Sequence, residues 1–96
     1  MKKINLLKKV GSFAENKDKA RDIRLHEIIP ALEKNEEVIL DFKQVESATQ
    51  SFIHALISDL IRKYGIEILD MISFKNCNET IKKIITIVVD YMQETD

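Results

Sequence analysis

A short apolar run, Val38-Ile39-Leu40, constrains the fold of this chain more than any other feature. It holds two β-branched residues and is bounded by polar residues, a pattern that predicts a strand buried on both faces, as inside a parallel sheet. After a polar turn, apolar residues follow at helical spacing for more than three turns. They are Phe52, Ile53, Leu56, Ile57, Leu60, Ile61 and Tyr64. The pattern therefore predicts a strand, a loop and a helix that covers the sheet with this apolar side.

The rest of the chain continues this alternation. We predict three core strands, at about Lys3–Leu7, Val38–Phe42 and Ile72–Lys75, with a major helix after each. Strands that alternate with helices imply a parallel sheet with right-handed crossovers. The expected fold class is α/β: a small single-domain β-α sandwich, with a mainly parallel sheet of about three core strands and three main helices. Strand Val38–Phe42 is expected in the centre, because the other two strands carry more polar residues.

Cap residues and helix breakers set the expected boundaries. Asn16 and Asn78 are the expected N-caps of the first and last main helices, and Gly65 is the expected C-cap of the second. Pro30 lacks an N–H donor, so it predicts a kink or a break followed by a fresh final turn. Residues 66–71 are compatible with a short helical turn. Residues 81–92 keep helical spacing and predict the last helix, with a strand at Ile84–Val89 as the alternative.

Length and charge limit the number of domains and the class of partner. Ninety-six residues with 45% hydrophobic content support one domain, residues 1–96. Fifteen Lys plus Arg against 16 Asp plus Glu leave a net charge of -1, which disfavours nucleic acid as the main partner. No segment approaches the ~18 apolar residues of a membrane span. Lys8 and Lys9 also interrupt the amino-terminal apolar stretch, which argues against a signal peptide. We expect a cytoplasmic protein with no membrane partner.

The loop and helix start after the central strand hold the candidate site, because ligands reach a strand-loop-helix unit there. Thr49 is the expected N-cap. Ser51 stands in the first helical turn, where the helix dipole and free N–H groups would favour a phosphate on its hydroxyl. The alternative is that these residues only start the helix, with Thr49 as the cap or with Ser47 and Gln50 as a capping box.

A polar strip is predicted on the outer side of the same helix. If the apolar residues face the sheet, steps of three, four and four place Ser51, His54, Ser58 and Arg62 on that side. Together with Thr49 and Gln50 they are our candidate partner-binding residues. A solvated helix face would show the same pattern.

Other chemistry finds less support in the sequence. Asp41 and Glu46 place two carboxylates at one rim, but acid–base catalysis would also need a base or a substrate pocket. His26, His54 and Cys77 lack the close spacing of zinc ligands, so no metal is expected. A nucleophile pair of Cys77 with either histidine stays open, although a lone cysteine near a strand end is usually a packing residue. A single cysteine cannot form an intrachain disulfide.

Residues 38–45, followed by Thr49-Gln50-Ser51-Phe52, resemble the core of STAS domains, which include the anti-sigma-factor antagonists of bacteria. In that family an Asp-Ser-Ser-Gly motif opens the helix, and a partner kinase phosphorylates the second Ser. By residue match Ser51 falls on that Ser, and it is the one motif residue that this chain keeps. Thr49, Gln50 and Phe52 replace the other three. The resemblance implies the fold and a candidate phosphorylation site at Ser51.

A closer resemblance is to the bacterial STAS-like family of uncharacterised role. Four short motifs of that family recur here in the same order and cover most of the chain: residues 11–17, Asp41-Phe42, Thr49–Phe52 and Ser73–Asn76. The resemblance implies a signalling or regulatory setting without an established reaction. It also leaves weak nucleotide binding open, although Gly11 and Gly65 are too few glycines for a phosphate-binding loop or a dinucleotide fingerprint.

These observations favour a small regulatory module that binds a protein partner through the start and outer face of the second helix. A kinase-like ATPase is one candidate for this partner. We expect no enzymatic activity and no cofactor. Two alternatives stay open: a nucleotide-binding or enzymatic domain that uses the same rim, and a purely structural subunit of a homo-oligomer.

Overall fold

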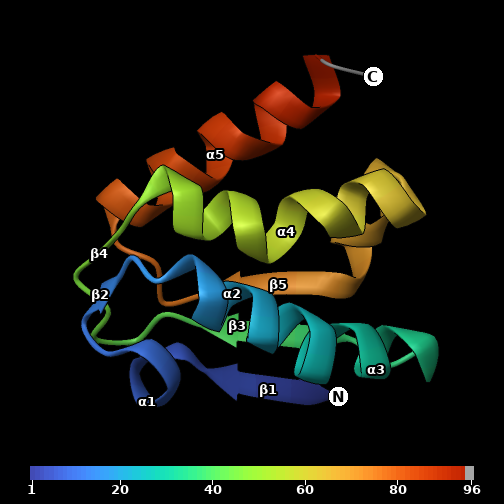
Figure 1. The fold of residues 1–96 in the computed structure, drawn as a ribbon, viewed down its shortest axis with the longest axis horizontal. Coiled ribbons are helices and arrows are strands. Elements are labelled where there is room, and N and C mark those ends of the chain that lie inside the picture. Colours follow the sequence, from blue (N-terminus) through green and yellow to red (C-terminus); the bar gives the residue numbers. More distant parts are fainter. Residues whose placement is uncertain (95–96) are drawn as a thin grey trace.

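Three parallel strands form the main sheet of the computed structural model, which describes residues 1–94. They are β1 (Lys2–Asn5), β3 (Val38–Asp41) and β5 (Ile72–Lys75), in the order β1-β3-β5. Lys2 is paired with Val38, and Val38 in turn with Ile72. Helical segments follow each strand along the chain (Figure 1). The predicted α/β class and the central place of the second predicted strand are confirmed.

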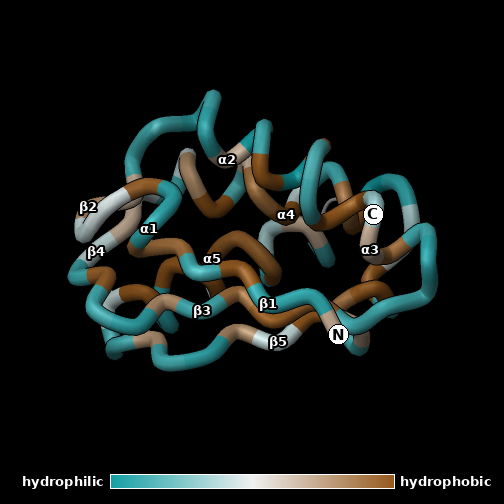
Figure 2. Tube along the Cα trace, turned by 90° about the horizontal axis from the view of Figure 1, so that it is seen from below, coloured by the Kyte–Doolittle hydropathy of each residue, from teal (hydrophilic) through white to brown (hydrophobic). Residues whose placement is uncertain are grey.

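The sheet buries one face. Val38 and Leu40 are fully buried and align with Ile4 and Ile72 on neighbouring strands. Ile39 points to the other face, where it is half-buried between Lys3 and Ser73. Figure 2 shows helices α2 and α4 on one side of the three strands. The expectation that this strand is buried on both faces is therefore wrong, because the helices cover one side of a two-layer fold.

Helix α4 (Gln50–Tyr64) lies between α2 (Lys17–Ile23) and α5 (Glu79–Glu94) and packs against both (Figure 1). Its predicted apolar side is buried. The fully buried side chains are Phe52, Ile53, Leu56 and Ile57, and Leu60 and Ile61 are almost fully buried. Gly65 ends the helix with φ 86°, a conformation that favours glycine, and its N–H donates to the Ile61 carbonyl at 2.8 Å. The predicted C-cap is confirmed.

The first main helix changes its hydrogen-bond pattern before Pro30. Asn16 caps α2, accepting from the N–H groups of Asp18 and Lys19. The chain continues as a π-helical stretch, η1 (Arg24–Ile28), and then as α3 (Ile29–Glu33). The Ile29 N–H donates to the Arg24 carbonyl, five residues earlier. This wider turn accommodates a proline that cannot donate, as the predicted break requires.

The last predicted helix is also confirmed. Asn78 accepts from the Ile81 N–H at 2.9 Å at the start of α5. Residues Ile84–Val89 lie within this helix, so the alternative strand is wrong. The predicted short turn at residues 66–71 is a 3-10 helix, η2 (Ile66–Met71). No helix within residues 1–94 is long and apolar enough to span a membrane.

Two short features differ from the prediction. Strand β1 ends at Asn5, because the Asn5 side chain accepts from the Lys8 N–H and starts a short helix, α1 (Leu6–Val10). The predicted extension of the strand to Leu7 is therefore wrong. A second sheet pairs β2 (Phe13–Ala14) in parallel with β4 (Ser47–Ala48). It lies beside the start of α4 and was not predicted, since two-residue strands leave no periodic signal.

Candidate functional site

The start of α4 is built around Thr49. Its backbone is extended, with φ -82° and ψ 156°, and its hydroxyl oxygen accepts from the Phe52 N–H at 3.0 Å. Thr49 is therefore the N-cap, as predicted, and Ser47 lies in β4 instead of forming a capping box. Among residues 1–94, no hydrogen-bond acceptor meets the N–H groups of Gln50 and Ser51. These two donors are the part of the helix start that remains available to a ligand or a phosphate.

The small β2–β4 sheet fixes the position of this helix start. The Thr49 N–H donates to the Ala14 carbonyl at 2.9 Å, and the Glu46 N–H donates to the Ser12 carbonyl at 2.8 Å. The loop before α4 is thereby tied to the segment before α2. As a result, the start of α2 and the start of α4 lie beside one another, although more than thirty residues separate them in the sequence.

An open cavity of about 560 Å³ lies at this junction. Its lining comes from three helices: Lys17 from α2, Gln50, Ser51, His54 and Ala55 from α4, and Tyr91 from α5. The His54 and Tyr91 rings lie 6.4 Å apart, tilted by 55°. The structure thus brings together three predicted site residues, Gln50, Ser51 and His54. It adds Lys17 and Tyr91, which helical periodicity within one segment could not have placed there.

A second cavity of about 430 Å³ adjoins the first between α2 and α4, and the two share Lys17, His54 and Ala55. We call the two together the α2–α4 groove. The rest of the second cavity is lined by charged residues and Ser58: Asp18, Arg21, Arg24, Ser58, Asp59 and Arg62. The groove therefore runs from Ser51 at the start of α4 to Arg62 near its end.

Arg24 links the two sides of this groove. It is 8% exposed and stands at the first position of the π-helical stretch. Its guanidinium donates to the Ala55 carbonyl through Nη1 and lies 3.3 Å from Asp59 Oδ2 through Nη2. Arg62 Nη1 holds the other Asp59 oxygen at 2.9 Å. One carboxylate thus forms ion pairs with two arginines, and its pair with Arg24 joins α4 to the first main helix.

Burial of Ser58 corrects the predicted polar strip. Ser51 and Arg62 are exposed and His54 is half-buried, but Ser58 is 2% exposed. Its hydroxyl donates to the His54 carbonyl and lies 3.2 Å from His54 Nδ1. Ser58 is hidden because α2 packs along this side of α4, which is not a free outer face. Ser51, His54 and Arg62 therefore offer side-chain surface to a partner there, and Ser58 offers almost none.

Asp41 and Glu46 have separate environments. Asp41 is 6% exposed, and its Oδ1 accepts from the Lys43 N–H and from Asn76 Nδ2, each at 2.9 Å. Lys3 Nζ lies 3.7 Å from Oδ2. The Asn76 amide, the Lys43 N–H and the Lys3 charge hold the pKa of the Asp41 carboxyl below its usual value. Glu46 is exposed, and its carbonyl accepts from Asn78 Nδ2 at 2.7 Å. Asp41 therefore joins the ends of the strands instead of facing a ligand.

The cysteine and histidine candidates are not brought together. Within residues 1–94, no group of three or more His, Cys, Asp or Glu side chains is placed to hold a metal ion. The hydrogen-bond partner of Cys77 is the Lys75 carbonyl, 3.9 Å from Sγ. Burial raises the pKa of the Cys77 thiol, the opposite of what a nucleophile needs. His54 contacts Ser58 and Tyr91 instead, and His26 lines a separate cavity beside Lys9 and Glu27.

Comparison with known proteins agrees with this architecture. A family model described as a STAS-like domain of unknown function (DUF4325) matches residues 20–82, more than half of the chain. The match includes β3, the loop after it, all of α4 and β5. Searches of curated proteins and of solved structures found no match. The central strand and helix that carried the sequence resemblance are thus the part that the family model covers, and the chain belongs to this STAS-like domain family.

Proposed function

We propose that this protein is a small cytoplasmic regulatory module that docks a protein partner at the start of α4 and along the α2–α4 groove. Phosphorylation of Ser51 would switch the docking. The observation that carries the proposal is the exposure of Ser51 in the first turn of α4, at the edge of a cavity that Lys17 also lines. The resemblance to anti-sigma-factor antagonists assigns the same position to a phosphorylated serine.

The physical chemistry of the site suits a phosphate. A phosphoserine carries a charge of about -1.5 to -2 at neutral pH. At position 51 this charge would lie beside the free N–H groups that start α4 and in the same cavity as Lys17. The Ser51 side chain is exposed, so the modification would change the charge of the surface while the fold persists. Binding and folding are thereby separable at this residue.

The contact residues follow from their exposure. Gln50 and Ser51 are exposed, Thr49 and His54 are half-buried, and Arg62 is exposed at the far end of the groove. We therefore keep these five as the partner-binding residues and leave out the buried Ser58. A kinase-like ATPase is the partner that the family resemblance suggests, since it would both bind this surface and transfer the phosphate.

The test uses the full chain as bait in an extract of the native cell, with Ser51→Ala and Ser51→Asp beside the parent. We expect the parent and Ser51→Ala to retain one partner that Ser51→Asp loses. Incubation with the partner and ATP should phosphorylate the parent at Ser51, as mapped by mass spectrometry, and leave Ser51→Ala unmodified. If neither substitution changes affinity for the purified partner by more than about twofold, roughly 0.4 kcal/mol, the switch at Ser51 is wrong.

Nucleotide binding is a second candidate, favoured by the 560 Å³ cavity that combines a helix start with Lys17. Titration with labelled ATP and GTP tests it, and Lys17→Ala is the informative variant. Saturable binding that Lys17→Ala weakens would support a nucleotide site, and turnover would make the protein an enzyme. Absence of ATP and GTP binding, together with binding of a protein partner at this cavity, would favour the docking function.

A structural role in a homo-oligomer is favoured by two exposed apolar side chains on α5. Ile87 is 50% exposed and Tyr91 is 52% exposed, four residues apart on one side of the helix. Sedimentation of the parent beside Ile87→Asp distinguishes this role. A dimer that the substitution dissociates would support it, whereas a monomeric parent would exclude it.

A further inference from the structure

We propose that the α2–α4 groove binds an acidic segment of the partner protein, and that Lys17 and Arg21 are the residues that pair with its carboxylates. The inference rests on the proposed function, because it names the chemistry of the partner that docks beside Ser51. It concerns two residues of α2 that the family resemblance at the start of α4 does not involve.

The charges of the groove favour an acidic occupant. Among residues 1–94, four cationic side chains line it, Lys17, Arg21, Arg24 and Arg62, against two carboxylates, Asp18 and Asp59. Four positive and two negative charges leave an excess of two positive charges, in a chain whose net charge is -1. A concave surface of one sign attracts a partner of the opposite sign and selects against partners of its own sign.

Not all of these cations are available. Arg24 and Arg62 both hold Asp59, so their guanidinium groups are already engaged within the protein. Lys17 and Arg21 are exposed, and neither forms an ion pair among residues 1–94. They stand four residues apart at the start of α2, so their side chains lie on one side of that helix. The groove therefore presents two free cations above a cluster that the Arg24 network keeps in place.

The position of Arg24 indicates that the groove is a structured surface and not a chance cluster of exposed charges. An almost fully buried arginine occurs where a π-helical stretch begins, and such stretches are rare and often lie at functional sites. Its bonds to Ala55 and Asp59 fix the distance between the two helices that form the walls. The groove is thus held open by contacts of its own, before any partner arrives.

His54 adds a polar contact of defined kind. The Ser58 hydroxyl has one proton, and it donates this proton to the His54 carbonyl. At the second contact, 3.2 Å away, Ser58 Oγ therefore accepts from His54 Nδ1. The neutral imidazole then carries its proton on Nδ1 and presents Nε2 as an acceptor. A hydroxyl or N–H group next to the carboxylates of the segment would complement it.

This chemistry also explains how a phosphate on Ser51 would act. Ser51 and Lys17 line the same cavity, so a phosphate there would attract Lys17 and repel the carboxylates of the segment. Loss of binding would follow from competition for one cation within a fold that stays intact.

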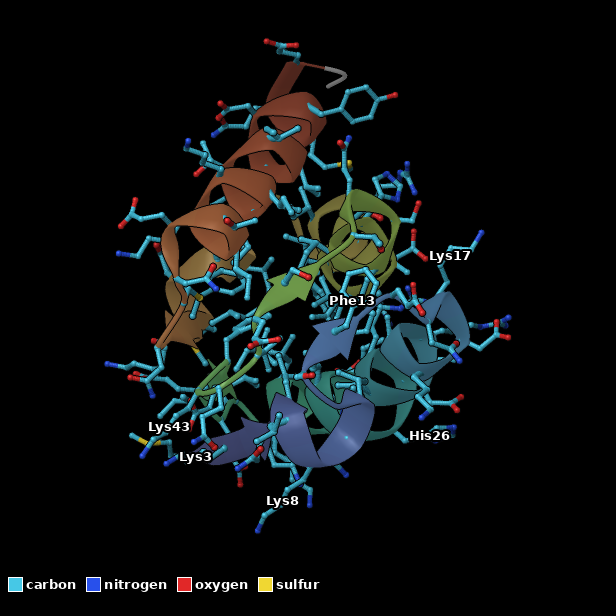
Figure 3. All side chains as sticks on the ribbon, turned by 90° about the vertical axis from the view of Figure 1, so that its left-hand side faces the viewer. Lys3, Lys8, Phe13, Lys17, His26 and Lys43 are labelled. Atoms are coloured by element: carbon cyan, nitrogen blue, oxygen red, sulfur yellow. The ribbon has the colours of Figure 1, made fainter. Side chains whose placement is uncertain are left out.

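The experiment measures binding of a fluorescein-labelled octaglutamate peptide to the full chain at about 20 mM salt, where surface charges are weakly screened. Octaglutamine is the neutral probe. The groove variant is Lys17→Glu with Arg21→Glu, and the control variant is Lys8→Glu with Lys43→Glu. The two double variants change the net charge equally, and all four positions are exposed. Figure 3 shows Lys8 and Lys43 along one edge of the molecule, away from Lys17.

We expect octaglutamate to bind the parent and the control variant alike, within about twofold, and the groove variant at least about tenfold more weakly. Octaglutamine should not bind. Amide shifts in an NMR titration should concentrate at residues 17–24 and 50–62. Equal weakening of both double variants, or no binding of octaglutamate at about 1 mM, would overturn the proposal, because attraction would then be general or absent.

The outcome also separates this proposal from the switch at Ser51. Loss of binding in the groove variant with no effect of Ser51→Asp would uphold the acidic groove and reject the switch. A phosphorylated Ser51 that controls a natural partner, with octaglutamate bound equally by the parent and the groove variant, would uphold the switch and reject the acidic groove.

Discussion

Asp41 and Ser51 stand ten residues apart on either side of one loop, and the fold treats them in opposite ways. Asp41 ends the central strand with its carboxylate enclosed by Lys3, Lys43 and Asn76. Ser51 lies exposed in the first turn of the next helix, its N–H has no acceptor within residues 1–94, and a cavity lies beside it. A polar residue at a strand end is therefore a candidate site only when the fold has left its hydrogen-bonding capacity unused.

The largest effect should come from the core that supports both residues. Leu56 is fully buried on the sheet side of α4, so Leu56→Ala should lower the free energy of unfolding by about 2 to 5 kcal/mol through lost burial and a cavity. Chemical denaturation followed by circular dichroism measures it. A loss below about 1 kcal/mol would mean that this side of α4 does not form the core that supports Asp41 and Ser51.

Asp41→Ala should destabilise the fold less than Leu56→Ala and more than the loss of one cap. It removes two hydrogen bonds to a charged acceptor and an ion pair, which tie β1, the loop and the segment after β5 to the end of β3. The thermal midpoint of the variant measures this. A midpoint equal to that of the parent would show that the enclosed carboxylate is as dispensable as an exposed one.

The same residue should give the fold an acid sensitivity. The folded pKa of Asp41 lies below its ordinary value of 3.8, so its contribution is complete above about pH 4 and is lost as the pH falls through the folded pKa. Asp41→Asn removes the titrating group. We expect the stability difference between parent and Asp41→Asn to shrink below about pH 4, measured by denaturant midpoints. A stability difference that is independent of pH would contradict the lowered pKa of the Asp41 carboxyl.

Thr49→Ala tests the cap between the two residues. Loss of its bond to the Phe52 N–H should cost about 0.5 to 2 kcal/mol, and Thr49→Ser should restore most of it. Failure of the serine variant to restore stability would assign the effect to the Thr49 methyl group and its packing.

Ser51→Ala should have the smallest effect on stability, within about 0.5 kcal/mol, because the side chain is exposed and forms no hydrogen bond within residues 1–94. Ser51→Asp should be neutral or slightly stabilising, since a negative charge in the first turn complements the helix dipole. A loss above about 1 kcal/mol for Ser51→Ala would place Ser51 among the structural residues with Asp41.

The periodic parts of the fold were predictable from the sequence. The apolar run at residues 38–40 and the apolar spacing of residues 52–61 each form one local pattern, and the structure has the predicted strand and helix there, although Ile39 is only half-buried. The caps Asn16, Thr49 and Asn78 were predictable as well, because an N-cap depends on the residue and its immediate neighbours.

Local sequence patterns could not predict which helices pack against each other. The spacing of Ser51, His54, Ser58 and Arg62 is the spacing of one side of a helix, but α2 packs on that side and buries Ser58. The same packing brings Lys17, Arg21 and Arg24 to the site from more than twenty residues away. The pairing of β2 with β4 ties the starts of these two helices together. Each of these strands has two residues, and strands so short have no detectable period in the sequence.

The most direct test of the contrast compares Ser51→Asp with Asp41→Ala in one pair of measurements, the thermal midpoint and the affinity for octaglutamate. We expect Ser51→Asp to keep the midpoint and to weaken binding at least about threefold, because its charge lies in the cavity with Lys17. Asp41→Ala should lower the midpoint and, while folded, bind as the parent does. Unchanged binding by Ser51→Asp, within about twofold or roughly 0.4 kcal/mol, would contradict the claim that Ser51 controls the groove.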